Sequence, residues 1–114
     1  MVVTVMEPAV AIGHYESIRR IAMPVTRINH FEARRDSSER LHTFMQAVVA
    51  KVRSQPGCRS VRLLRSTENP DHLAIVEEWD SIEAHKHAAK SIPAEELEKA
   101  RSLVSKPPVG EYYQ

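Results

Sequence analysis

The sequence predicts an α+β protein of the ferredoxin-like class, in which helices cover one face of a four-stranded antiparallel sheet. Two features of the pattern support this prediction. Short apolar stretches typical of strands are interspersed with stretches whose apolar residues recur every three or four positions, as in helices. Turn-forming residues separate them in the order strand, helix, strand, strand, helix, helix, strand, which contains the β-α-β-β-α-β arrangement.

The composition is that of a nearly neutral globular domain. The chain has 114 residues, of which 42% are hydrophobic and 27% are charged, with a formal net charge of +1. No basic stripe indicates nucleic acid, and no apolar run approaches the roughly 20 residues that span a bilayer. The single cysteine, Cys58, excludes an intrachain disulfide and fits a reducing compartment. We therefore expect a cytoplasmic protein that binds neither nucleic acid nor membranes.

Residues 1–22 differ in pattern from the rest of the chain. Pro8 and Gly13 interrupt them, and they show no clean amphipathic repeat. They also lack the positively charged start of a signal peptide. We expect residues 23–114 to form the domain and residues 1–22 to be an N-terminal extension. An early start codon would explain such an extension, as would an added strand or helix that packs on a partner subunit.

The first strand and the first helix follow in that order. The strand is expected over residues 24–33, where apolar side chains occur among polar ones. Asp36 or Ser37 suits the N-cap of the helix, because a side-chain oxygen there accepts a hydrogen bond from a free backbone N–H. Residues 55–57, Gln-Pro-Gly, end the helix. Its apolar stripe consists of Leu41, Phe44, Met45, Val48, Val49 and Val52.

Two further strands are expected over residues 58–65 and 72–79. A polar turn over residues 67–71, with a proline inside it, separates them by a short distance along the chain. Strands this close in sequence pair as a β-hairpin.

Two helices and a last strand complete the predicted fold. The next helix covers residues 81–89, with Asp80 or Ser81 as its N-cap. A further helix begins at Pro93, and residues 111–114 form a short terminal strand. The stripe of that further helix consists of Leu97, Ala100, Leu103 and Val104.

Both faces of the predicted sheet carry apolar side chains. Leu63 alternates with Leu64 in the second strand, and Ile75 alternates with Val76 in the third. The helices cover only one face, so the other needs a cover of its own. The same sheet of a second copy is the simplest cover, and two-fold dimers are the commonest symmetric assemblies. We therefore expect a homodimer that forms through the sheet face.

Three segments of the chain carry a family resemblance. Residues 55–65 read Gln-Pro-Gly-Cys-Arg-Ser-Val-Arg-Leu-Leu-Arg, residues 69–71 read Asn-Pro-Asp, and residues 74–84 read Ala-Ile-Val-Glu-Glu-Trp-Asp-Ser-Ile-Glu-Ala. In this order and spacing they resemble the antibiotic biosynthesis monooxygenase family, over roughly residues 24–113. The resemblance implies a dimeric α+β barrel. It also implies oxidation of a small aromatic or quinol substrate by O₂, with neither metal nor flavin.

The resemblance directs attention to three polar residues as candidates for catalysis. Asn29 falls near a pocket-facing asparagine of the family, where an amide binds a substrate oxygen or an oxygen adduct. His85 and His87 are candidates for the general base, because histidine titrates near neutrality. Two positions along a helix differ by about 200°, so at most one of these histidines faces a pocket. The alternatives are a strand asparagine bonded to a neighbouring loop and solvated helix histidines.

Three aromatic residues, Phe44, Trp79 and Tyr112, are candidates for substrate binding. For Trp79, packing in a core or an interface is favoured over substrate contact. Trp79 shares its strand face with Glu77, whose carboxylate needs a partner among apolar neighbours.

No metal or cofactor is expected. The pair His85 and His87 is a poor helical chelate, and the chain has neither a Cys-x-x-Cys nor a His-x-x-x-His motif. Haem-degrading relatives carry a tryptophan and a haem-binding histidine at places that fall here on Ala88 and residues 97–99, which contain neither residue. This difference argues against haem degradation. Two alternatives to the monooxygenase remain, a non-catalytic small-molecule-binding or stress-response dimer and a cofactor-free isomerase.

Overall fold

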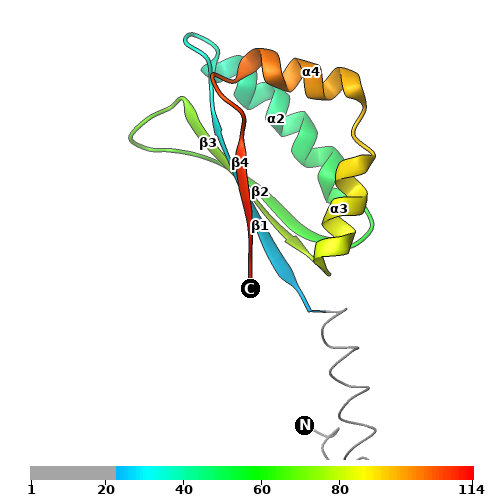
Figure 1. Cartoon of the computed structure of the whole chain (residues 1–114). Coiled ribbons are helices and arrows are strands. Elements are labelled where there is room, and N and C mark those ends of the chain that lie inside the picture. The colour runs from blue at the N-terminus through cyan, green and yellow to red at the C-terminus, as the bar shows by residue number, and fades with distance from the viewer. Residues whose placement is uncertain (1–22) are drawn as a thin grey trace, which may run out of the picture.

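The structure is a computed structural model that describes residues 23–114 (Figure 1). Residues 1–22, for which we expect an N-terminal extension, lie outside the described residues. The elements are β1 (Val25–Glu32), α2 (Ser38–Arg53), β2 (Cys58–Arg65), β3 (His72–Trp79), α3 (Ile82–Lys90), α4 (Ala94–Leu103) and β4 (Val109–Tyr113). Their order confirms the predicted succession of strands and helices.

The four strands form one antiparallel sheet in the order β2-β3-β1-β4. β1 therefore lies in the middle, paired with β3 on one side and with the C-terminal β4 on the other. Arg27 lies opposite both Glu77 and Tyr112, and Asn29 lies opposite Gly110. Residues directly opposite each other project from the same face of a sheet. The register thus brings these side chains together on one face.

All three helices cover that face of the sheet (Figure 1). The apolar stripe predicted for α2 faces inward, and its Leu41 is fully buried. The main core lies between α2 and the sheet and is formed by Ala33, Leu41, Met45, Val49, Val61, Leu73, Ile75, Leu103 and Val104. A second, smaller cluster of Val25, Trp79 and Ala88 lies under α3. None of the helices within residues 23–114 is long and apolar enough to cross a membrane.

Both serines predicted as helix N-caps occupy those positions, but only one of them bonds to the helix backbone. Ser81 caps α3 as predicted, because its hydroxyl accepts a hydrogen bond from the backbone N–H of Ala84 at 3.1 Å. Ser37 occupies the N-cap position of α2, but its hydroxyl accepts from the Arg40 guanidinium at 3.0 Å rather than from the backbone.

The last strand was predicted to begin at residue 111, and this is wrong by two residues. β4 begins at Val109, because Val109 and Gly110 pair with β1. Pairing with a central strand decides this boundary, and local composition does not reveal it.

The sheet face turned away from the helices carries an apolar patch, which we call the outer patch: Ile28, Leu64, Ala74, Val76 and Val109. Leu64 is 42% exposed and Val109 is 61% exposed. Both parities of the central strands are therefore apolar, as the sequence indicates. Exposed apolar patches of this kind typically mark interaction surfaces.

Candidate active site

An apolar cavity of about 290 Å³ lies between the sheet and the helices. Its volume is at the low end of the roughly 300–1,000 Å³ range typical of ligand pockets, so it suits a small ligand. Side chains of α2, including Phe44, Met45 and Val48, form one wall. Polar groups enter from the sheet through Asn29 and Glu77.

Glu77 is the buried carboxyl group of this cavity. Its residue is only 5% exposed, and its Oε1 accepts a hydrogen bond from Trp79 Nε1 at 2.8 Å. The two residues lie two apart on β3 and therefore share the helix-facing side of the sheet. Burial raises the pKa of Glu77, although the bond from Trp79 and the charge of Arg27 act in the opposite direction. Glu77 therefore holds a proton more strongly than an ordinary glutamate.

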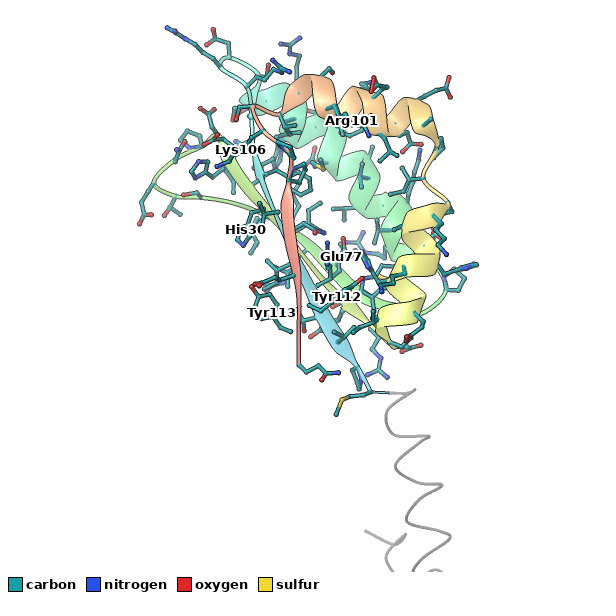
Figure 2. All side chains as sticks on the ribbon, in the orientation of Figure 1. His30, Glu77, Arg101, Lys106, Tyr112 and Tyr113 are labelled. Carbon is teal, nitrogen blue, oxygen red and sulfur yellow. The ribbon has the colours of Figure 1, made fainter. Side chains whose placement is uncertain are left out.

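His85 projects from α3 and lies between two of these groups. Its Nδ1 is 2.6 Å from the hydroxyl of Tyr112, and its Nε2 is 3.8 Å from Oε1 of Glu77. The rings of Trp79 and Tyr112 both meet the imidazole edge-on, with centroids at 5.5 Å and 5.3 Å. Figure 2 shows Glu77 and Tyr112 on the helix side of the sheet, whereas His30 and Tyr113 point away from it. The imidazole is thus held between a phenol and a carboxyl.

The surroundings of His85 favour its neutral form. Burial, followed by the charges of Arg27 and Lys86, lowers the pKa of His85 to about 4. A neutral imidazole has one N–H and one acceptor nitrogen, and the partner of one nitrogen sets the role of the other. When Nδ1–H donates to the Tyr112 oxygen, Nε2 is an acceptor directed toward the Glu77 side.

Asn29 lines the cavity from β1, and its side-chain amide is hydrogen-bonded to a neighbouring arginine. Arg27 Nε donates a hydrogen bond to Asn29 Oδ1 at 3.0 Å. The guanidinium also lies over the ring of Tyr112, with its Cζ 4.6 Å from the ring centroid. Arg27 therefore connects the amide of Asn29 with the phenol that contacts His85.

The structure brings some of the predicted residues together and separates others. Asn29, Phe44, Trp79 and His85 line the cavity. Tyr112 is not part of the lining but lies behind His85 as its hydrogen-bond partner. His87, by contrast, is exposed and does not line the cavity. The two-residue spacing on a helix explains this division, because it directs the two imidazoles to nearly opposite sides.

Two polar residues of the site were missed as functional candidates. Glu77 had a usable signal, since it shares its strand parity with Trp79 and has apolar neighbours. Arg27 also had one, because it lies two residues before Asn29 and so shares its face of the strand. Among residues 23–114, no group of three His, Cys, Asp or Glu side chains is arranged to hold a metal ion.

The fold and this cavity define an α+β domain with an apolar cavity between the sheet and the helices, and comparison with known families gives its class. The model of the antibiotic biosynthesis monooxygenase family matches residues 24–101, which is more than half of the chain. The protein belongs to this family. No curated protein sequence matches it.

Solved structures share the fold over most of the chain. Rv0793 from Mycobacterium tuberculosis is 25% identical, with a TM-score of 0.71 over 80% of this chain and 93% of that one. A variant of SnoaB from Streptomyces nogalater, a cofactor-independent oxygenase, is 18% identical, with a TM-score of 0.69 over 80% and 91%. A conserved protein from Methanosarcina mazei is 13% identical, with a TM-score of 0.74 over 85% and 97%. These similarities establish the ferredoxin-like α+β fold.

Proposed function

We propose that this protein is a cofactor-independent monooxygenase that oxidises a small phenol or quinol with O₂. The observation that carries the proposal is the set of Asn29, Glu77 and His85 at one apolar cavity of about 290 Å³. Membership of the family supports it, as does the similarity in fold to a cofactor-independent oxygenase. The cavity volume favours substrates of one or two rings over larger polycyclic ones.

The reaction begins with removal of the substrate hydroxyl proton. His85 Nε2 and the Glu77 carboxylate lie 3.8 Å apart and act together as the acceptor. The low pKa of His85 keeps its imidazole neutral, while the raised pKa of Glu77 makes the carboxylate the stronger base of the two. The proton therefore ends on this pair, and the substrate becomes an electron-rich phenolate.

The phenolate then reduces O₂ directly. A ring carbon transfers electrons to O₂ and forms a C–O bond, which gives a peroxide anion that takes a proton back from the Glu77–His85 pair. The Glu77–His85 pair then takes the C–H proton from that carbon, the O–O bond breaks with formation of a ring carbonyl, and the departing hydroxide receives this proton from the pair and leaves as water. The net change converts a phenol and O₂ into a quinone and H₂O.

The remaining cavity residues bind and orient the substrate. The Asn29 amide donates a hydrogen bond to a substrate oxygen, where negative charge develops. Phe44 and Trp79 contact the ring, and Tyr112 holds His85. His87 takes no part, because it lies on the exposed side of α3.

We further propose that two copies associate through the outer patch. Leu64 and Val109 are largely exposed apolar side chains on the sheet face opposite the helices. Burial of apolar surface contributes roughly 25 cal/mol per Å², so a face of this kind is stabilised by a second copy of itself.

A non-catalytic small-molecule-binding dimer is the second candidate function. The pKa of about 4 at His85 supports it, because a base this weak accepts a phenol proton poorly without Glu77. A cofactor-free isomerase would use the same base without O₂.

Oxygen consumption separates these functions. Purified protein is supplied with a panel of one- and two-ring quinols and phenols, without added metal or flavin. The proposal predicts uptake of one O₂ per product, its loss in Glu77→Gln and Asn29→Ala, and its retention in the control His87→Ala. Binding without uptake across the panel would contradict the monooxygenase and favour the second candidate.

A further inference from the structure

We propose that Arg27 is a positioning residue that fixes the Asn29 amide with its NH₂ group toward the cavity, so that the site selects ligands with an acceptor oxygen. This inference rests on the proposed function in one respect, namely that the cavity is the ligand site. It adds a preference for ligands with an acceptor oxygen, which follows from the pairing register of β1 and β4.

The contacts of Arg27 determine which way the amide points. A guanidinium carries only donors, so the Asn29 atom that faces it must be the carbonyl oxygen. Arg27 Nε donates to that oxygen at 3.0 Å. The Nδ2 group then occupies the other side of the amide, and no hydrogen bond within residues 23–114 engages it. Since Asn29 lines the cavity, its free N–H groups are available to a ligand.

Arg27 has one residue opposite it on each neighbouring strand. Tyr112, opposite Arg27 on β4, presents its ring face to the guanidinium at 4.6 Å. Glu77, opposite Arg27 on β3, is close enough for the charge of Arg27 to oppose the rise of its pKa. The guanidinium is therefore held by its contacts with Tyr112 and Asn29, and it lies in the electrostatic field of Glu77.

Gly110 provides the space that this pair occupies. It lies opposite Asn29 on β4, and a Cβ placed there would overlap Asn29 Oδ1 and Arg27 Nη2 and would lie 2.7 Å from Arg27 Cζ. The absence of a side chain at Gly110 thus leaves room for the Asn29 amide and the Arg27 guanidinium. A side chain at position 110 would displace the pair and release the amide.

The chemical consequence is a preference for a phenolate or carbonyl oxygen at this wall. An amide that is free to flip presents either its oxygen or its nitrogen, whereas the amide held by Arg27 presents only donors. A positive charge behind a hydrogen-bonded amide also strengthens its donors. A ligand that lacks an acceptor oxygen leaves these N–H groups unpaired.

The test uses two probes of the same shape, 1-indanone and its hydrocarbon indane. Trp79 is the only tryptophan of the chain and lines the cavity, so its fluorescence reports the binding of either probe. Difference infrared spectra of bound 1-indanone add the carbonyl stretching frequency, which hydrogen bonding lowers. For the wild type we expect 1-indanone to bind about tenfold more tightly than indane, as one net hydrogen bond implies.

The variants Arg27→Met and Gly110→Ala are expected to reduce this ratio to near one and to return the carbonyl stretch toward its unbonded value. Indane should bind to both variants within about twofold of its wild-type affinity. Arg27→Lys keeps a donor and should restore part of the ratio, and Asn29→Ala should abolish it.

Three outcomes would overturn the proposal. The first is a wild type that binds both probes equally or binds neither measurably. The second is an affinity ratio of 1-indanone over indane that stays at its wild-type value in Arg27→Met but is lost in Asn29→Ala. The third is an equal loss of affinity for both probes in Arg27→Met, which indicates a merely structural role. None of these measurements depends on turnover. A failure of oxygen uptake is therefore distinguishable from a failure of this inference.

Discussion

The hydroxyl of Tyr112 lies 2.6 Å from Nδ1 of His85, and this contact joins the C-terminal strand to α3 across the inner face of the sheet. The two residues are 27 positions apart in sequence. The contact leaves only Nε2 of the imidazole free to meet the cavity side, where Glu77 lies. The orientation of the candidate base therefore depends on the last strand of the domain.

Replacement of Tyr112 by Phe removes this partner and keeps the ring that stacks under Arg27. We expect a loss of about 0.5–1.5 kcal/mol in the free energy of unfolding, as for one hydrogen bond, and a roughly tenfold lower kcat from the freed imidazole. Urea unfolding and steady-state turnover measure the two effects. Tyr113→Phe is the matched control, because its hydroxyl donates a hydrogen bond to Glu111 rather than contacting His85. An equal loss of kcat in both variants would contradict the role of Tyr112.

The pH dependence of stability tests the environment of His85. Its folded pKa of about 4 lies below the ordinary value of 6.5, so the unfolded chain binds a proton that the folded protein excludes. Stability should therefore fall as the pH decreases from 6.5 toward 4, by up to about 3 kcal/mol for this group. The raised pKa of Glu77 acts in the opposite sense, because the folded protein keeps that proton to a higher pH than the unfolded chain.

Urea unfolding between pH 4 and pH 7.5 measures this slope. His85→Asn should flatten it, whereas the exposed control His87→Asn should leave it unchanged. A slope that persists in His85→Asn would show that another group excludes the proton.

The two adjacent glutamates of β3 allow a matched comparison of charge at the cavity. Glu77 is buried at the cavity, whereas Glu78 is exposed on the other face and accepts a hydrogen bond from Ser60. Glu77→Gln should lower kcat by a factor of about 10²–10⁴, as expected for loss of a general base. Its free energy of unfolding at pH 7 should stay equal or rise, because a neutral amide is less costly to bury than a carboxylate. Glu78→Gln should change neither quantity, and a normal kcat in Glu77→Gln would exclude Glu77 as the base.

The proposed dimer is tested by one charge on the outer patch. Leu64 and Leu97 are exposed to nearly the same degree, 42% and 41%, but Leu64 lies on the outer patch and Leu97 on α4. Leu64→Glu would bury an unpaired carboxylate between two sheets, so it should weaken association at least tenfold. Light scattering after size exclusion gives the mass of each form. Equal masses for Leu64→Glu and Leu97→Glu would show that the outer patch is not the interface.

Much of the fold could be predicted from local pattern. The recurrence of apolar residues in α2 and the bounds of β2 and β3 follow from periodicity and from turn residues, and the structure confirms them. The start of β4 did not follow, because strand pairing rather than composition makes Val109 and Gly110 extended. Local signals thus specify elements whose own pattern is strong.

The candidate site was predictable only in part, for a related reason. Helix geometry limits a pocket to one of His85 and His87 but does not say which, because that choice depends on the rotation of α3 over the sheet. The placement of Arg27 against Asn29 and over Gly110 depends on the register between β1 and β4, which are far apart in the chain. Which polar side chains meet at the cavity therefore depends on the register between distant strands. A single sequence does not reveal that register.

The most direct test of the monooxygenase is the origin of the oxygen in the product. A quinol or phenol that supports oxygen uptake is turned over under ¹⁸O₂ in ordinary water, without metal or flavin, and the product is analysed by mass spectrometry before carbonyl exchange. The proposed mechanism gives one ¹⁸O atom in each product molecule, and Glu77→Gln should lose that product. Product that carries no ¹⁸O, or that takes its new oxygen from water, would contradict it.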